Sequence, residues 1–287
     1  QQLGAQVWLK AENLLPSGAY KYRGAMNKIT SLIERYGKEL RIVTASSGNH
    51  GMACALAARN LGVQANVVVP VSTPQVKKDS IRALGANLVE VGATYDESFV
   101  SACELAEKEH LYYVHPTSDR YTVGGQGTIS LEILDQCPQV EQIVVPIGGG
   151  GLITGIALTM KTLKPSVKIY GVMPVGSAVY VESRRQGQLV TLDHCSSMAD
   201  AVVRKTGEEY LYPYIEKYVD DIFTVTEDSI RQAVRTACLY GKLTLEGSGA
   251  LALAALLEKK CPLSPGTVLI CSGGNIDKAV LDLCMQA

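Results

Sequence analysis

The fold class of this chain follows from Glu141-Gln-Ile-Val-Val-Pro-Ile147, Gly148-Gly-Gly-Gly151 and Leu152-Ile-Thr-Gly-Ile-Ala-Leu-Thr-Met-Lys161, which run without a break. An apolar run of strand length, a glycine turn and a run with helical apolar spacing predict a buried strand that leads into a helix. Four successive glycines exceed what an ordinary tight turn requires. Because they have no Cβ, their N–H groups can point into one concavity at the positive end of the helix dipole, which suits a phosphate group.

The glycine loop is not typical of a nucleotide site. It lacks the terminal Lys-Ser/Thr of a Walker loop, and it has no Gly-x-Gly-x-x-Gly fingerprint followed by a ribose-binding acid. No Lys or Arg flanks the turn, so backbone amides must supply most of the hydrogen bonds to the phosphate. The sequence therefore favours a phosphate monoester over a mononucleotide at this loop, with a purely structural turn as the alternative.

The rest of the chain repeats the alternation of strand and helix. Strand patterns at 65–69, 87–91 and 112–114 alternate with helical patterns after Pro74, from 95 to 108 and from Gly125. This alternation predicts an α/β fold with parallel sheets flanked by helices. A chain of 287 residues buries roughly 75% of its unfolded surface, enough for one large core or two lobes.

A lysine lies between aromatic residues in Ser17-Gly-Ala-Tyr20-Lys21-Tyr22-Arg23-Gly24. An amine is a nucleophile only when it is unprotonated, and an apolar pocket or a neighbouring cation favours that form. Tyr20, Tyr22 and Arg23 can supply both, so Lys21 is a candidate for a Schiff base. An isolated lysine is more often a solvated helix residue, so this hypothesis depends on the other motifs.

Two further loops follow strand patterns. Thr44-Ala-Ser46-Ser47-Gly48-Asn49-His50-Gly51 combines hydroxyls, an amide and a helix N-terminus, which suit a carboxylate; a simple Ser/Asn helix cap is the alternative. The strand Val268-Leu-Ile-Cys runs into the turn Ser272-Gly-Gly-Asn275, which alone would be an ordinary loop.

Together these segments resemble the fold-type II pyridoxal-phosphate enzymes, and most closely the serine racemase and serine/threonine dehydratase branch. That branch carries a lysine motif, a Ser-x-Gly-Asn-His loop, a Gly-Gln-Gly-Thr helix start, a tetraglycine loop and a Ser-Gly-Gly-Asn turn. Here, in the same order, these are Ser17–Ala25, Ser46–His50, Gly125–Thr128, Gly148–Gly151 and Ser272–Asn275.

The resemblance covers essentially the whole chain, and it implies a two-lobed fold similar to that of the tryptophan synthase beta chain. A large domain that binds pyridoxal 5'-phosphate is expected from residues 1–40 and 119–287. A small domain is expected from residues 41–118.

The resemblance also implies roles for single residues. Lys21 would form the Schiff base with the cofactor and then remove the substrate α-proton, while Tyr20 would pack on one face of the cofactor ring. The phosphate would be bound by Gly148, Gly149, Gly150 and Gly151. Asn49 would bond the ring 3-oxygen, and Ser272 would meet the pyridine nitrogen. The substrate carboxylate would lie in the loop of Ser46, Ser47, Gly48, Asn49 and His50.

The implied reaction is that of an ammonia-lyase, or dehydratase, which converts a small β-hydroxy amino acid such as L-threonine or L-serine to a 2-oxo acid and ammonia. A hydroxyl at the pyridine nitrogen cannot stabilise a charged pyridinium as a carboxylate would, which favours prompt loss of the β-substituent.

The alternative is an amino acid racemase with side elimination activity, which needs a second acid/base group. Ser47 is the candidate for that group, because many plain dehydratases have alanine there. A non-catalytic binding protein could dispense with Lys21, Asn49 or Ser272, but all three are present.

Composition excludes several other partners. A net charge of −1, from 27 basic and 28 acidic residues, gives no reason to expect nucleic acid or an anionic membrane as partner. No apolar run is long enough to span a bilayer. The eight cysteines form no Cys-x-x-Cys pair, which is typical of reduced thiols in a cytoplasmic enzyme. We expect a homodimer that acts on a small amino acid.

Four features depart from the family or stand outside it. Metal-activated relatives have a glutamate and an aspartate where this chain has Met173 and Val179, so no metal site is expected. Ala201 stands where the family usually has glycine against the cofactor. The tyrosine-rich stretch 210–218 predicts either an inward helix face or a subunit interface. The adjacent His194 and Cys195 are interpreted as a loop pair.

Overall fold

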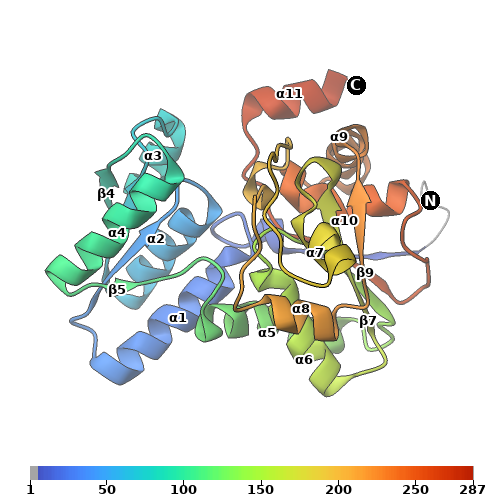
Figure 1. Ribbon diagram of the computed structural model, residues 1–287, viewed down its shortest axis with the longest axis horizontal. Coiled ribbons are helices and arrows are strands. Elements are labelled where there is room, and N and C mark those ends of the chain that lie inside the picture. The colour runs from blue at the N-terminus through green and yellow to red at the C-terminus, as the bar shows by residue number, and fades with distance from the viewer. Residues whose placement is uncertain (1–5, 287) are drawn as a thin grey trace. The chain divides into compact units, whose positions relative to one another are not determined.

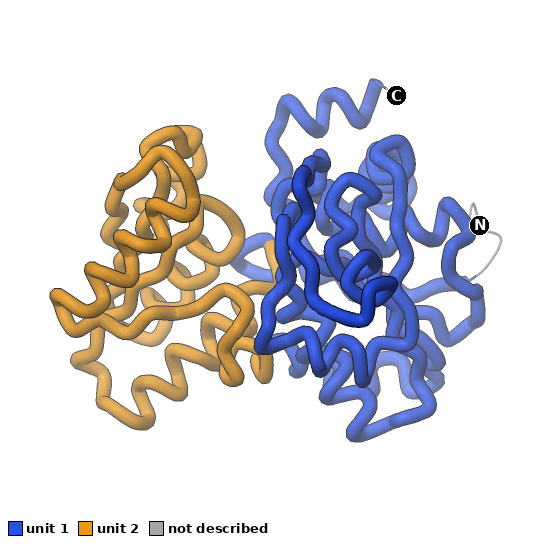
Figure 2. The backbone as a smooth tube through the Cα atoms, viewed as in Figure 1, with its two compact units in different colours: residues 1–18, 126–287 blue, residues 19–125 orange. Residues whose placement is uncertain are grey.

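The computed structural model describes residues 6–286 and divides them into two compact units (Figures 1 and 2). Unit 1 comprises the residues up to Gly18 and from Gln126 onward, and unit 2 comprises Ala19–Gly125. These boundaries differ from the expected ones, because residues 19–40 and 119–125 also belong to the smaller unit. The helix that starts at Lys21 packs its apolar face, including Ile29 and Leu32, into the core of that unit.

Unit 2 is built on a four-stranded parallel sheet with the order β4-β3-β2-β5. Its strands are β2 (Arg41–Ala45), β3 (Gln64–Val69), β4 (Asn87–Glu90) and β5 (Tyr112–Tyr113). Its helices are α1 (Lys21–Tyr36), α2 (Asn49–Leu61), α3 (Gln75–Ala83) and α4 (Tyr95–Glu109). Helices α2, α3 and α4 each connect one strand to the next parallel strand of the sheet.

Both faces of this sheet are buried. Ile42 and Val67 pack with α1, α2 and α3, whereas the next residues along the strands, Val43 and Val68, pack with Ala102 of α4. Successive side chains of a strand point to opposite faces, so a continuous apolar run is what a sheet covered on both sides requires. This is why the strands of the chain show apolar runs rather than alternation.

Unit 1 holds a five-stranded parallel sheet with the order β1-β9-β6-β7-β8. Its strands are β1 (Trp8–Ala11), β6 (Gln142–Pro146), β7 (Lys168–Pro174), β8 (Asp221–Val225) and β9 (Thr267–Cys271). Its helices are α6 (Gly151–Leu163), α7 (Val179–Gln186), α8 (Tyr212–Tyr218), α9 (Glu227–Thr236), α10 (Gly247–Leu257) and α11 (Lys278–Gln286), together with the later part of α5 (Arg120–Gln136). The helix expected from Gly125 therefore begins earlier, at Arg120.

Helix α10 forms the centre of unit 1. Its residues from Gly247 to Leu256 are all buried, and its sequence of alanines and leucines has no polar face. A helix that is apolar all round must be covered on every side. Helix α9 and the strands β6, β7, β8 and β9 supply that cover.

The expected α/β fold with parallel sheets flanked by helices is confirmed. Between residues 6 and 286, no helix is both long enough and apolar enough to cross a membrane. The two glycine-rich turns at 148–151 and 272–274 both follow the carboxyl ends of strands in the unit 1 sheet, and Ser46–Gly48 follows β2 in unit 2. In open parallel sheets this is the edge at which ligands bind.

Candidate active site

Lys21 is the first residue of α1 in unit 2. Its side chain is half-buried, and Nζ donates a hydrogen bond to the carbonyl oxygen of Pro116 at 2.7 Å. The same nitrogen lies 5.2 Å from the centroid of the Tyr20 ring. The amine is therefore held in a defined place by a backbone acceptor and an aromatic face, unlike a solvated helix lysine.

The loop of Ser46, Ser47, Gly48 and Asn49 connects β2 to α2, and all four residues are partly exposed. The hydroxyl of Ser46 accepts a hydrogen bond from the Gly48 N–H at 3.2 Å, and the Met52 N–H closes the first helical bond on the Gly48 carbonyl. A Cβ at Gly51 would lie 2.3 Å from the Ser46 carbonyl oxygen, so only glycine allows this close approach. The first N–H groups of a helix have no partner within it, which suits a bound carboxylate.

The side chain of His50 lies away from that loop. It is 3% exposed, its Nε2 atom lies 2.9 Å from the Val114 carbonyl oxygen, and the Cys54 sulfur lies 3.5 Å from the same nitrogen. Burial, helped by the positive charge of Lys21, lowers the pKa of His50 from 6.5 to about 3. The neutral ring donates from Nε2 to the Val114 carbonyl and so does not face the loop. Only the backbone N–H of His50 remains for a carboxylate.

Residues 114–116 connect these two groups within unit 2. The carbonyl of Val114 accepts from His50 and also from the Thr44 hydroxyl at 2.9 Å, while the carbonyl of Pro116 accepts from Lys21. Neither Val114 nor Pro116 can be recognised from the sequence as part of a site, because both act through backbone atoms that carry no residue signature.

The tetraglycine loop of unit 1 joins β6 to α6. Gly150 has a φ of +97°, and a Cβ there would lie 2.7 Å from the Ile215 side chain. A Cβ at Gly148 would lie 3.0 Å from the Cα atom of Val202. The loop is therefore backed by protein on one side, and its conformation demands glycine.

The amides of this loop fit the phosphate of the expected cofactor. The first bond of α6 runs from the Thr154 N–H to the Gly150 carbonyl, which leaves the N–H groups of residues 151–153 without a partner inside the helix. The first turn of α6 contains no acidic residue that would repel an anion. Charge-assisted hydrogen bonds contribute about 1.5–3 kcal/mol each, so a few such amides are enough to hold a dianion.

Ser272 directly follows β9 and is 4% exposed. Its hydroxyl donates to the Ser248 carbonyl over 3.4 Å, a long bond that leaves the oxygen able to accept from or donate to another group. The Ser248 hydroxyl is buried without a hydrogen-bond partner among the described residues. Ser248 was not singled out from the sequence, because a serine at a helix start resembles an ordinary cap.

The positions that depart from the family have ordinary structural surroundings. Met173 and Val179 are fully buried, and Ser177 between them bonds the backbone of Arg204 in both directions. Within residues 6–286 there is no group of three or more His, Cys, Asp or Glu side chains that could hold a metal ion. Ala201 is exposed, and its carbonyl oxygen would lie 3.4 Å from a Cβ at Gly148.

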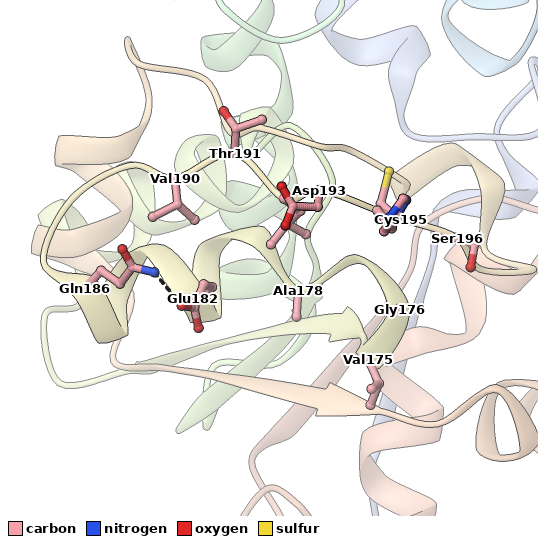
Figure 3. A pocket seen from close by; sticks show the side chains of 12 residues that line it. Val175, Gly176, Ala178, Glu182, Gln186, Val190, Thr191, Asp193, Cys195 and Ser196 are labelled. Atoms are coloured by element: carbon pink, nitrogen blue, oxygen red, sulfur yellow. Dashed lines mark hydrogen bonds between the residues drawn. The ribbon is translucent and has the colours of Figure 1, made fainter.

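A cavity of about 630 Å³ lies in unit 1 beside α7 (Figure 3). Glu182 and Gln186 line it from α7, and the loop 190–196 lines it from the other side, with His194 and Cys195 in that loop. Hydrogen bonds from Arg185 and Gln186 lower the pKa of Glu182 to about 2, and the ionised carboxylate is paired with the Arg185 guanidinium. None of the residues expected in the active site lines this cavity.

The expected site residues thus fall into two groups. Unit 2 brings Tyr20 and Lys21 to the segment that the His50 ring also contacts. Unit 1 carries the tetraglycine loop and Ser272, each after a neighbouring strand, since β6 pairs with β9.

Known proteins are similar to this chain in sequence and in fold. Residues 1–273 match the family model described as "Pyridoxal-phosphate dependent enzyme". The chain is 37% identical over 279 residues to the L-threonine ammonia-lyase of Thermotoga maritima. The match covers 97% of this chain and 69% of the relative. It is 39% identical over 294 residues to the serine racemase of Rattus norvegicus. That match covers 100% of this chain and 88% of the relative.

Solved structures agree with these relatives. The processed form of threonine deaminase isoform 2 from Solanum lycopersicum superimposes with a TM-score of 0.93 and 36% identity, and the match covers 99% of this chain and 84% of that one. Maize serine racemase superimposes with a TM-score of 0.90 and 34% identity, covering 99% of this chain and 88% of that one. Because the family model, the relatives and the solved structures all match nearly the whole chain, it belongs to the family of pyridoxal-phosphate-dependent enzymes, and its cofactor is pyridoxal 5'-phosphate.

Proposed function

We propose that this enzyme is an ammonia-lyase that removes water and then ammonia from a small β-hydroxy amino acid, with L-threonine or L-serine as substrate and a 2-oxo acid as product. The observation that carries this proposal is the position of Lys21, whose amine is bonded to the Pro116 carbonyl and packed against Tyr20. Relatives named L-threonine ammonia-lyase, from Thermotoga maritima and Geobacter sulfurreducens, are 37% and 38% identical to the chain and support it.

The family resemblance assigns each of the following residues a role toward the cofactor. Lys21 would bind it covalently, Tyr20 would pack on its ring and Asn49 would bond the ring 3-oxygen. The tetraglycine loop would bind its phosphate, and Ser272 would meet its pyridine nitrogen. When bound, the cofactor supplies an electron sink for the bond that breaks at the substrate Cα.

Lys21 would move the proton. Its neutral amine takes the proton from the substrate Cα onto Nζ, and the resulting ammonium gives a proton to the departing β-hydroxyl, which leaves as water. The Pro116 carbonyl can accept a hydrogen bond from Nζ in both protonation states, so the nitrogen stays in place between the two transfers. The released enamine then hydrolyses to the 2-oxo acid and ammonia.

Ser272 favours elimination over a reaction that needs a long-lived carbanion. The neutral Ser272 hydroxyl would not hold a proton on the pyridine nitrogen as a carboxylate would, so the bound cofactor would supply a weaker electron sink. Loss of the β-hydroxyl from the substrate is then the favoured outcome.

A second candidate function is racemisation, and Ser47 is the feature that favours it. A racemase needs a donor that returns the proton to the opposite face of Cα. Ser47 is partly exposed in the loop proposed to hold the substrate, and the serine racemase of Rattus norvegicus is 39% identical to this chain. The two functions differ in product, not in cofactor.

A substrate panel tests these functions together. The purified enzyme is incubated with the L- and D-isomers of serine and threonine, and both 2-oxo acid and inverted amino acid are measured. Formation of 2-oxo acid from L-threonine or L-serine supports the lyase. Absence of any 2-oxo acid, with the cofactor spectrum present, would overturn it, and inverted amino acid as the main product would favour the racemase.

We also propose that the enzyme is a cytoplasmic homodimer. All eight cysteines are free thiols, which is typical of a reducing compartment. Tyr210 and Tyr214 are exposed and pack edge to face at 6.0 Å, as aromatic side chains at subunit interfaces do. The mass in solution, measured by light scattering with and without a Tyr210→Ser change, tests the dimer; a monomeric mass for the unmodified protein contradicts it.

A further inference from the structure

Tyr180 lies directly behind the tetraglycine loop. It belongs to α7 in unit 1, is fully buried, and stands outside every motif of the sequence analysis. Its hydroxyl donates to the Gly149 carbonyl oxygen at 2.9 Å and accepts from the Glu208 N–H at 2.9 Å. A backbone N–H can only donate and a carbonyl can only accept, so the direction of both bonds is fixed.

The bond to Gly149 determines which way the next amide points. No described peptide bond is cis, and in a trans peptide the C=O of one residue and the N–H of the next point to opposite sides. Because Tyr180 holds the Gly149 carbonyl on its own side, the Gly150 N–H must point away from Tyr180. The next amides along the chain are the first amides of α6, which are unpaired within their helix.

The ring of Tyr180 is itself held tightly. A Cβ at Gly150 would lie 3.0 Å from the Tyr180 hydroxyl, and a Cβ at Gly207 would lie 2.7 Å from two ring carbons. The Tyr212 ring stacks on it at 6.5 Å. Burial raises the pKa of Tyr180, which keeps the hydroxyl protonated and able to donate.

We propose that Tyr180 is a positioning residue for cofactor binding, which fixes the Gly149–Gly150 peptide so that the Gly150 N–H faces the phosphate. The inference rests on the proposed role of the tetraglycine loop as the phosphate site. Tyr180 does not touch the phosphate; it acts through the backbone of Gly149. Without its hydroxyl, the peptide loses the bond that selects this orientation, and the phosphate loses a preorganised donor.

The test compares pyridoxal phosphate with pyridoxal, which lacks the phosphate. Dissociation constants of both compounds are measured by titration of the cofactor-free full-length chain, for the unmodified protein and for Tyr180→Phe. The matched control is Tyr212→Phe, which removes the hydroxyl of the stacked ring; that hydroxyl bonds the Ser183 carbonyl rather than the glycine loop. The phosphorus NMR shift of the bound cofactor is recorded as a readout independent of activity.

For Tyr180→Phe we expect about tenfold weaker binding of pyridoxal phosphate, unchanged binding of pyridoxal and a shifted phosphorus signal. Tyr212→Phe should leave all three unchanged. If Tyr180→Phe keeps the full preference of the unmodified protein for the phosphorylated compound, the inference is overturned. If the unmodified protein itself shows no such preference, the proposed role of the loop fails instead.

A second variant covers the case in which Tyr180→Phe does not fold. Gly207→Ala places a methyl group against the ring of Tyr180 and displaces its hydroxyl without removing it. The same selective loss of affinity for the phosphorylated compound is expected. Equal weakening of both compounds would contradict the inference.

Discussion

The imidazole of His50 and the carbonyl of Val114 form a buried hydrogen bond of 2.9 Å, two residues before the carbonyl that accepts from Lys21. This bond ties the start of α2 to the segment 114–116, so the place of the Lys21 amine depends on a ring that need not touch the substrate. Because burial keeps that ring neutral, acid conditions put a proton on it only at the expense of the fold.

The first prediction concerns stability in acid. The pKa of His50 falls from 6.5 in the unfolded chain to about 3 in the folded one, so below pH 6.5 the unfolded state binds the additional proton. The contribution of His50 to stability is fully present above pH 6.5 and is lost as pH falls from there toward 3. Between pH 7 and pH 5 this loss is about 2 kcal/mol.

The measurement is urea unfolding at pH 7 and pH 5 for the unmodified protein, for His50→Gln and for the exposed control His110→Asn. His50→Gln should be less stable at pH 7 but should lose about 2 kcal/mol less between the two pH values. The control should behave like the unmodified protein. Parallel losses in all three proteins would show that His50 is not the titrating group.

The second prediction assigns the covalent attachment to Lys21. Hydride reduction of the yellow enzyme should fix the cofactor on Lys21, and peptide mapping should find it there. Lys21→Ala should lose turnover by several orders of magnitude while it still binds the phosphorylated cofactor non-covalently. The exposed Lys38→Ala should be unaffected, and an adduct on any other lysine would disprove the assignment.

The third prediction separates the two candidate reactions at Ser47. In a plain lyase, Ser47→Ala should leave elimination of the L-isomer within about threefold of the unmodified rate, because no proton is needed on the opposite face. In a racemase the same change should abolish formation of the D-isomer. Ser46→Ala is the control, since it removes the bond from Gly48 and should affect both isomers alike. An unchanged rate of D-isomer formation in Ser47→Ala would exclude Ser47 as the second acid/base group.

The fourth prediction follows from the buried Met173 and Val179. Hard divalent cations require oxygen ligands, and these two side chains offer none. We therefore expect activity and melting temperature to be unaffected by excess chelator or by millimolar Mg²⁺. Assays of both quantities under the two conditions check this, and a saturable gain in either would mean that other residues form a cation site.

The sequence predicted those parts of the fold and site that depend on local residue patterns. The glycine loop, the loop after β2 and the Ser272 turn lie where strand and helix patterns meet, and each was placed correctly at the end of a strand. Glycines at such turns can be recognised in the sequence because the backbone conformation requires them.

Contacts between residues far apart in the sequence could not be predicted from such local patterns. Tyr180 reaches Gly149 across 31 residues and Lys21 reaches Pro116 across 95, and both contacts end on backbone atoms. The apolar residues of α1, such as Ile29 and Leu32, pack into the core around α2, and no local pattern in the sequence indicates that contact. For the same reason the smaller unit includes residues that were expected in the larger domain.

The close approach of Gly51 to the Ser46 carbonyl also limits how this enzyme can be altered in the laboratory. A library of variants that randomises the whole loop would consist mostly of proteins that cannot close it, because any side chain at position 51 would collide with a backbone oxygen at 2.3 Å. A productive search for new substrates would keep Gly51 fixed and vary Ser47, where the chemistry can change while the backbone stays as it is.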